Sequence, residues 1–288
     1  MDNFLQEVQK IKVNRVGQLV SLHKPLLLLL TIGKVYNGHK NLFLFDEIEY
    51  ELACLISKYG LKNTSRINPQ YPFIYLASNS NIWTCSKNKN ELSHPDAASR
   101  KELVGSLGLF TDDFFNYLLK RENLINTIQL LLNQYWSEAY HAELLNDIGI
   151  FDFNPGEVQK QKQDRSRKFV EHVLDAYERK CAICHQSIRL GDALVGIDAC
   201  HVKPIQHFGD DNVNNGIALC KIHHWALDRG AISISQAMSL LISKKLNGNK
   251  LHEYFTSFEN NDLFIPRDAS FGLNKSNLEY HTKYIFVK

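Results

Sequence analysis

The apolar side chains of residues 1–153 recur mostly at the three- and four-residue spacing of helices. Pro25 opens a run of leucines that continues to Tyr36 and stops at Asn37-Gly38, which predicts a helix with proline in its first turn. The run is apolar on nearly every side, so we expect this helix to lie at the centre of its domain. Residues 46–59 and 112–148 show further helical repeats.

Two shorter apolar segments have the composition of strands. Residues 71–77 (YPFIYLA) and 82–85 are rich in aromatic or β-branched residues, and they flank a polar turn, SNSN, at 78–81. They predict a short β-hairpin within an otherwise helical domain.

The apolar periodicity disappears between residues 154 and 167 (NPGEVQKQKQDRSR), which we interpret as a linker. Helical spacing returns over residues 168–179 and leads into strand-like segments. The pattern therefore predicts one domain at 1–153 and a second at 168–288. The aromatic-rich tail at 236–288 is expected either to pack on the second domain or to pair two copies of the chain.

The composition is that of a globular protein, with 44% hydrophobic and 22% charged residues. A net charge of +2 does not indicate nucleic-acid binding by itself, although residues 1–45 carry a local excess of lysine and arginine. The six cysteines lack the spacing of a disulfide framework, and the N-terminus lacks the apolar core of a signal peptide. The longest apolar run, Leu26–Ile32, is far shorter than the roughly 20 residues of a membrane span. We therefore expect a cytoplasmic protein that does not enter the membrane.

Two pairs of potential metal ligands stand 35 residues apart in the second domain. They are Cys181-x-x-Cys184 and Cys220-x-x-His223. Zinc prefers tetrahedral thiolate and imidazole ligands, and each pair can supply one edge of the tetrahedron. The spacing predicts a structural zinc ion held by all four residues.

Three further polar residues lie between or beside these pairs. His201 ends a predicted strand, Asn215 precedes a second strand, and His224 lies in a predicted helix directly after the second pair. A strand, a loop, a strand and a helix, with one histidine on the first strand and one on the helix, is the layout of a ββα-metal nuclease site.

The segment from Cys181 to Gly230 thereby resembles the HNH endonuclease family, which contributes a histidine, an asparagine and a histidine in this order. The resemblance implies that His201 is the general base that deprotonates water for attack on a phosphodiester. It implies that Asn215 pins the loop that orients His201, and that His224 ligates a catalytic Mg²⁺ or Mn²⁺ ion.

One position departs from the family pattern. Many HNH sequences carry an aspartate directly before the first histidine as a metal ligand, whereas this chain has Cys200. The nearest carboxylate is Asp198, our candidate for the second metal ligand. In a regular strand Asp198 shares the face of Cys200 and points away from the face of His201, so it reaches the metal if the strand bends.

The first domain resembles the sulfur-binding domain of phosphorothioate-dependent restriction endonucleases. The matching phrases are HKPLLLLL at 23–30, YPFIYL at 71–76 and the tryptophan at 83, and the order of domains also matches. The resemblance covers about residues 1–235. The residues expected to contact DNA or its sulfur are Arg15, His23, Lys24, Tyr71, Pro72 and Tyr75.

Sulfur recognition of this kind has a physical basis. Sulfur in place of a non-bridging phosphate oxygen is larger and less strongly hydrated, so an apolar concavity accepts it where oxygen would lose its hydration. Tyr71, Pro72 and Tyr75 would form the concavity. Tyr75 stands where other members have a small residue, which alters the expected shape of the concavity.

The expected fold class is α+β: a mostly helical DNA-recognition domain with a short β-hairpin, followed by a zinc-stapled ββα-metal (HNH) domain. The expected function is cleavage of double-stranded, phosphorothioated DNA, and a homodimer would supply the two active sites of a double-strand cut. Two alternatives remain open. One is an HNH endonuclease of other specificity, for methylated bases or nicking, and the other is a non-catalytic zinc module that binds DNA or a protein.

Overall fold

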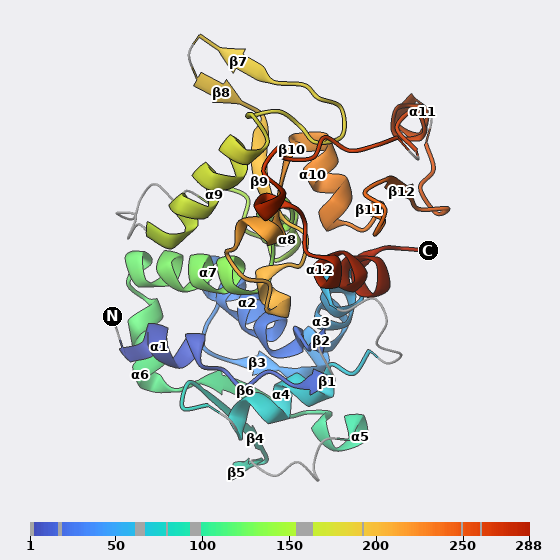
Figure 1. The fold of residues 1–288 in the computed structure, drawn as a ribbon. Helices are drawn as coiled ribbons and strands as arrows, with labels where there is room; N and C mark the ends of the chain where they lie inside the picture. The colour runs from blue at the N-terminus through green and yellow to red at the C-terminus, as the bar shows by residue number, and fades with distance from the viewer. Residues whose placement is uncertain are drawn as a thin grey trace. The chain divides into compact units, whose positions relative to one another are not determined.

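The structure is a computed structural model of the chain, and it describes residues 3–16, 19–60, 67–78, 80–92, 99–153, 164–191, 193–248, 250–259 and 261–288. The chain forms two compact units, residues 1–160 and 161–288 (Figure 1). Each unit has its own hydrophobic core. Among the described residues, no helix combines the length and the apolar character that crossing a membrane requires.

The first unit is mostly helical with two small sheets. Its helices are α1 (Asn3–Gln9), α2 (His23–Tyr36), α3 (Phe45–Tyr59), α4 (Gln70–Ala77), α5 (Arg100–Leu103), α6 (Asp112–Leu118), α7 (Arg121–Tyr135) and α8 (Glu138–Asp147). Its strands are β1 (Arg15–Val16), β2 (Leu19–Val20), β3 (Phe43–Leu44), β4 (Trp83–Lys87), β5 (Asn90–Glu91) and β6 (Leu107–Phe110).

Helix α2 lies in the core of the first unit, as its apolar pattern predicts. Every residue from Pro25 to Gly33 is buried, and the helix packs against α3, α4 and α7. The side chain of Asn37 then donates a hydrogen bond to the carbonyl oxygen of Gly33 (3.0 Å), and Gly38 adopts a φ of 80° that ends the helix. The predicted stop at Asn37-Gly38 is confirmed.

An antiparallel sheet in the order β3-β6-β4-β5 packs beside these helices. Trp83, at the start of β4, is buried and donates from Nε1 to the carbonyl oxygen of Phe73 (3.0 Å). Its indole also packs against the rings of Phe43, Phe73 and Phe110. This aromatic cluster fastens α4 to the sheet.

The predicted strand at residues 71–77 is wrong, because this segment is helix α4. Four of its apolar side chains, Pro72, Phe73, Ile74 and Leu76, are buried, so no alternation of buried and exposed positions exists. A short apolar run of this kind cannot be assigned to strand or helix by periodicity alone. Strand β4 is present as predicted, but its partners are β5 and β6 rather than residues 71–77.

The second unit is built around a two-stranded hairpin and the helix that follows it. Its helices are α9 (Asp164–Ala176), α10 (Lys221–Asp228), α11 (Lys250–Thr256) and α12 (Lys275–Tyr280), with 3₁₀ turns at Ile205–His207, Val213–Asn215 and Ala269–Phe271 and a π-helical turn at His281–Ile285. Its strands are β7 (Ile188–Leu190), β8 (Ala193–Val195), β9 (Ile197–His201), β10 (Gly216–Cys220), β11 (Ile232–Ile234) and β12 (Leu240–Ile242).

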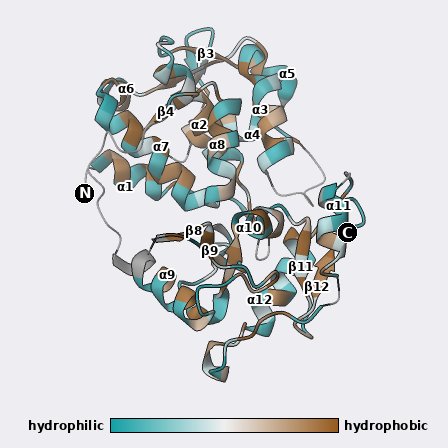
Figure 2. Cartoon of the chain, turned by 90° about the horizontal axis from the view of Figure 1, so that it is seen from above, coloured by the Kyte–Doolittle hydropathy of each residue, from teal (hydrophilic) through white to brown (hydrophobic). Residues whose placement is uncertain are grey.

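Strands β9 and β10 pair antiparallel, with His201 opposite Gly216 and Ile197 opposite Cys220. Helix α10 begins at the next residue, so the predicted ββα arrangement and the α+β fold class are confirmed. Helix α9 packs on the hairpin and presents Phe169 and Val173 to it, while its other side carries polar residues (Figure 2).

Helix α9 begins four residues earlier than the predicted helix. The last four residues of the predicted linker, 164–167, are therefore helical, and residues 154–163 lie outside the described part of the chain. The division between the two compact units falls between residues 160 and 161.

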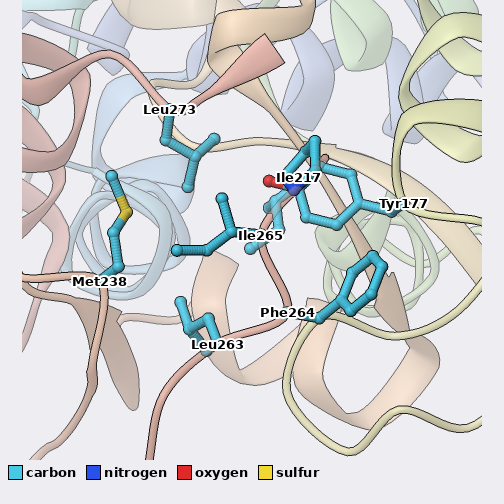
Figure 3. Close-up of a pocket in the computed structure, with 8 residues that line it drawn as sticks. Tyr177, Ile217, Met238, Leu263, Phe264, Ile265 and Leu273 are labelled. Carbon is cyan, nitrogen blue, oxygen red and sulfur yellow. The ribbon is translucent and has the colours of Figure 1, made fainter. Parts of the chain in front are cut away.

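The C-terminal tail packs into the core of the second unit. Leu240, Phe255, Leu273 and Leu278 are buried there with the residues of the hairpin. A small pocket in this region is lined only by side chains that lack a carboxylate or an imidazole (Figure 3): Tyr177, Ile217, Met238, Leu263, Phe264, Ile265, Pro266 and Leu273. Six of the eight lining residues belong to the tail, so the pocket lies where the tail packs on the rest of the second unit.

Candidate functional site

Three cysteines and one histidine converge next to the hairpin. Cys181 and Cys184 lie in the turn after α9, Cys220 ends β10, and His223 lies in the first turn of α10. One ligand atom of each residue lies within 4.8 Å of the others, and the three thiols are free. This is the set that the two spaced pairs predict.

The spacing of these atoms fits a tetrahedral metal site. The Sγ atoms of Cys184 and Cys220 are 3.9 Å apart, and Nδ1 of His223 lies 3.4 Å from Sγ of Cys181 and 3.2 Å from Sγ of Cys220. A zinc–sulfur bond of about 2.3 Å gives a tetrahedral edge of about 3.7 Å, with shorter edges to nitrogen. The four side chains therefore suit one metal ion.

Aromatic rings of the C-terminal tail enclose His223. The ring of Tyr254 stacks on the imidazole at a centroid distance of 5.4 Å, and Phe255 and Phe258 approach it edge-on at 5.6 and 5.4 Å. His223 itself is fully buried. The tail thus holds the ring of one ligand in place.

Asn215 joins the two ends of the loop between β9 and β10. Its Oδ1 accepts from the backbone N–H of Lys203 (2.8 Å), and its Nδ2 donates to the carbonyl oxygens of Lys203 (2.9 Å) and Asp210 (3.0 Å). The residue is fully buried. The loop passes so closely that a Cβ at Gly209 would lie 1.8 Å from the carbonyl oxygen of Lys203. The amide therefore fixes the loop that follows His201.

His201 ends β9 on the side of the hairpin that α9 covers. Its imidazole lies parallel to the ring of Phe169, with centroids 4.1 Å apart and an interplanar angle of 4°. Its Nε2 lies 3.0 Å from Oδ1 of Asp211. Burial lowers the pKa of His201, and Asp211 opposes that effect only in part. The imidazole is therefore neutral at pH 7 and able to accept a proton.

Gly216 makes the approach of α9 possible. A Cβ at Gly216 would lie 2.2 Å from Cγ2 of Val173 and 2.9 Å from Cε2 of Phe169. Because Gly216 pairs with His201 across the hairpin, its missing side chain lets Phe169 reach the histidine ring.

His224 lies in α10 between two carboxylates. Oδ2 of Asp198 is 2.8 Å from Nδ1, and Oδ2 of Asp228 is 3.1 Å from Nε2. Asp198 also pairs with Nζ of Lys221 at 2.8 Å. Burial alone would raise the pKa of Asp198, but the contacts with His224 and Lys221 lower it overall. The carboxylate of Asp198 is therefore ionised at neutral pH.

His201 and His224 thus have different partners beside the hairpin. Asp198 and the buried Cys200 alternate with His201 along β9, and Asp198 contacts His224 while His201 contacts Phe169.

Three residues of the site were not predicted from the sequence: Asp228, Asp211 and Phe169. Asp228 was open to detection, because it follows His224 by four residues on one helix and so shares its face. Asp211 and Phe169 reach His201 through a loop and a separate helix, and no local spacing indicates them.

Five of the six residues expected to contact sulfur or DNA lie in α2 and α4, which pack together. Tyr71 is 43% exposed and its ring lies 5.9 Å from that of Tyr75, but Pro72 is buried. Nζ of Lys24 donates to the carbonyl oxygen of Lys12 (2.9 Å), and burial lowers the pKa of His23. Arg15 lies in β1, and its side chain is outside the described part of the structure.

Comparison with known proteins identifies both units. Residues 1–153 match the family described as the ScoMcrA-like DNA sulfur-binding domain, and residues 181–235 match the HNH endonuclease family. No curated protein matches the chain significantly.

Several solved structures resemble part of the chain. The sulfur-binding domain of SprMcrA, complexed with phosphorothioated DNA, is 24% identical, with 53% of this chain and 95% of that chain covered and a TM-score of 0.45. The corresponding domain of ScoMcrA is 22% identical, with 53% and 99% covered and a TM-score of 0.45. The structure of the Type IV restriction endonuclease ScoMcrA is 21% identical, with 54% of this chain but only 30% of that chain covered and a TM-score of 0.45.

Proposed function

Because the chain belongs to the ScoMcrA-like DNA sulfur-binding domain family and carries an HNH endonuclease domain, we propose that it cleaves double-stranded DNA near phosphorothioate groups. The observation that carries the proposal is the ββα unit itself. His201, Asn215 and His224 all lie on this unit, and each has a defined contact. The first half of the same chain belongs to a family of DNA sulfur-binding domains.

In this proposal His201 is the general base. Its low pKa keeps the imidazole neutral, so it can take a proton from the attacking water. Asn215 contributes through its hydrogen bonds to the loop after His201, which limit the movement of that loop and of the His201 imidazole. The water then attacks the phosphorus of the phosphodiester while the 3′ or 5′ oxygen leaves.

A divalent ion, Mg²⁺ or Mn²⁺, would be held by His224 together with Asp228. An octahedral Mg²⁺ site has neighbouring ligand atoms about 3.0 Å apart, and Nε2 of His224 and Oδ2 of Asp228 are separated by 3.1 Å. Bound there, the ion supplies neutralisation of phosphate charge and stabilisation of the leaving oxygen. Asp198, expected as a ligand from the sequence, contacts the other nitrogen of His224, which is the place of a supporting carboxylate.

Cys181, Cys184, Cys220 and His223 would hold a structural Zn²⁺ ion. The donor chemistry and the atom spacing support zinc, because three thiolates and one imidazole form one of its common ligand sets.

We assign the recognition of sulfur to α4, and contacts with the surrounding phosphates to α2 and β1. Tyr71 and Tyr75 offer apolar surface to a poorly hydrated sulfur atom, and His23, Lys24 and Arg15 would contact the surrounding phosphates. Pro72 is buried, so in this proposal it supports the position of α4 and does not contact the sulfur itself.

The test is cleavage of phosphorothioated and unmodified copies of one plasmid with Mg²⁺ or Mn²⁺, alongside the variant His201→Ala. We expect only the phosphorothioated plasmid to be cut, and only by the wild-type chain. Equal cutting of both plasmids would overturn the sulfur specificity and favour an HNH endonuclease of other specificity. Absence of cutting with either metal would favour a DNA-binding zinc module.

Double-strand cuts are usually made by two active sites, so we further propose that two copies act together. Light scattering of the protein on a phosphorothioated duplex tests this: the expected mass is that of two chains per duplex. A single chain per duplex with linear product would contradict it.

A further inference from the structure

We infer that Asp211 is a positioning residue for His201, which fixes the proton of the imidazole on Nε2 and leaves Nδ1 as the atom that accepts a proton from water. The inference rests on the proposed role of His201 and specifies which nitrogen performs it. It starts from the 3.0 Å contact between Nε2 of His201 and Oδ1 of Asp211.

The identity of the donor follows from the chemistry of the two groups. An ionised carboxylate offers only acceptor atoms, so the hydrogen bond requires a proton on the imidazole nitrogen that faces it. In a neutral imidazole the second nitrogen then carries a lone pair. Nδ1 of His201 makes no hydrogen bond within the described part of the chain, and the side chain is 20% exposed. The free lone pair is therefore on Nδ1, which has no partner among the described residues.

Phe169 restricts the remaining freedom of the ring. A parallel contact at 4.1 Å leaves little room for rotation about the Cβ–Cγ bond of His201, because the imidazole would tilt into the phenyl ring. Phe169 is 3% exposed and packs in the core of the second unit. The plane of the imidazole is thus set by Phe169, and its proton is set by Asp211.

The loop that carries Asp211 is itself held. Nδ2 of Asn215 donates to the carbonyl oxygen of Asp210, the residue before Asp211. Asn215 therefore fixes the position of the Asp211 carboxylate as well as that of the loop. Asn215 is connected to His201 by two successive hydrogen bonds, one to the backbone of Asp210 and one from His201 to the side chain of Asp211.

The charged groups around His201 provide a matched control. Asp210, Asp211 and Asp228 all act on the imidazole through their charge, but only Asp211 forms a hydrogen bond with it among the described residues. Asp210→Ala and Asp211→Ala each remove one negative charge from the same loop. Only Asp211→Ala removes the acceptor that faces Nε2.

The first measurement needs neither DNA nor a catalytic metal. Long-range ¹H–¹⁵N spectra of the zinc-loaded full chain, assigned with His201→Ala, report which imidazole nitrogen carries the proton. We expect the Nε2–H tautomer in the wild type and in Asp210→Ala, and a mixture of tautomers in Asp211→Ala. A wild-type Nδ1–H tautomer, or an unchanged tautomer in Asp211→Ala, would overturn the inference.

The second measurement is cleavage of phosphorothioated duplex. We expect Asp211→Ala to lower kcat about 10- to 100-fold with KM nearly unchanged, Asp211→Asn to fall between it and wild type, and Asp210→Ala to stay within about 3-fold. Equal losses in Asp210→Ala and Asp211→Ala would show that charge alone matters and would overturn the positioning role. Full activity of His201→Ala would instead remove the proposed function, while the tautomer spectra would still decide the role of Asp211.

Discussion

Oδ2 of Asp198 lies 2.8 Å from Nδ1 of His224, on the side of the imidazole opposite Asp228. A carboxylate that accepts from one nitrogen of a ligating histidine orients the ring and increases the basicity of the other nitrogen. We therefore expect Asp198→Asn to weaken Mn²⁺ binding by about 10- to 100-fold in calorimetric titrations of the zinc-loaded protein.

Lys221→Ala is the control for that substitution, because Lys221 is the other partner of Asp198. Removing a nearby positive charge should leave Mn²⁺ affinity equal to wild type or higher. Unchanged affinity in Asp198→Asn would contradict the supporting role of the carboxylate.

The thiol and imidazole cluster should couple metal binding to folding. Cys181→Ser is expected to reduce the zinc content of the purified protein and to abolish the cooperative unfolding of the second unit, because such sites are assembled only in the folded state. Elemental analysis and thermal melts followed by circular dichroism measure both effects. Cys54→Ser, which changes an exposed free cysteine in α3, should retain zinc and stability.

Substitution of the neighbouring residues Asn214 and Asn215 should distinguish an effect on stability from an effect on cleavage. Asn215→Ala removes three hydrogen bonds to part-buried backbone groups of the loop, so we expect a loss of about 1 kcal/mol per hydrogen bond in the free energy of unfolding and a severe loss of cleavage. Asn214 donates instead to the carbonyl oxygens of Ser270 and Gly272 in the tail. Asn214→Ala should therefore lower stability and leave kcat close to wild type. Similar kcat losses in both variants would argue against a specific role for the loop.

Discrimination between sulfur and oxygen should depend on the tyrosines of α4. We expect Tyr71→Ala and Tyr75→Ala to reduce the ratio of affinities for phosphorothioated and unmodified duplex, because apolar contact area at the sulfur is lost. Fluorescence anisotropy with both duplexes at one salt concentration measures this ratio. Tyr50→Ala is the control, since Tyr50 lies 78% exposed on α3. If all three variants keep the wild-type ratio, the sulfur contact lies elsewhere.

His281 should make the second unit sensitive to acid. The residue is buried between Oγ of Ser233 (2.9 Å) and the carbonyl oxygen of Leu227 (3.0 Å), and burial lowers its pKa to about 4. The unfolded chain, with a histidine pKa of about 6.5, binds more protons between these values. Stability is therefore lost as the pH falls through 6.5, and the loss reaches about 3 kcal/mol below pH 4.

His281→Gln tests this linkage, because glutamine keeps a donor and an acceptor but does not titrate in this range. Urea unfolding of zinc-loaded wild type and variant between pH 7 and 4.5 should show a flatter profile for the variant. Parallel profiles would exclude His281 as the source of the acid sensitivity.

Some parts of the molecule follow from local sequence patterns and others do not. The central position of α2 follows from leucines on every side of a helix, and the thiol cluster follows from two short spacings. The sequence of α4 predicts a strand because its aromatic residues suit either structure, and its packing on Trp83 decides for the helix. The partners of His201 come from α9 and from the loop after β9, so only the tertiary fold brings Phe169 and Asp211 to it.

Tyr254, Phe255 and Phe258 enclose His223. These contacts limit how short a nuclease segment can be if it is to be moved to another protein. A chimera that transplants only residues 181–235 would carry the proposed catalytic residues but would lack the aromatic rings around His223 and the helix that carries Phe169. We therefore expect a transferable nuclease unit to need a junction before Asp164 and the tail through at least Phe258.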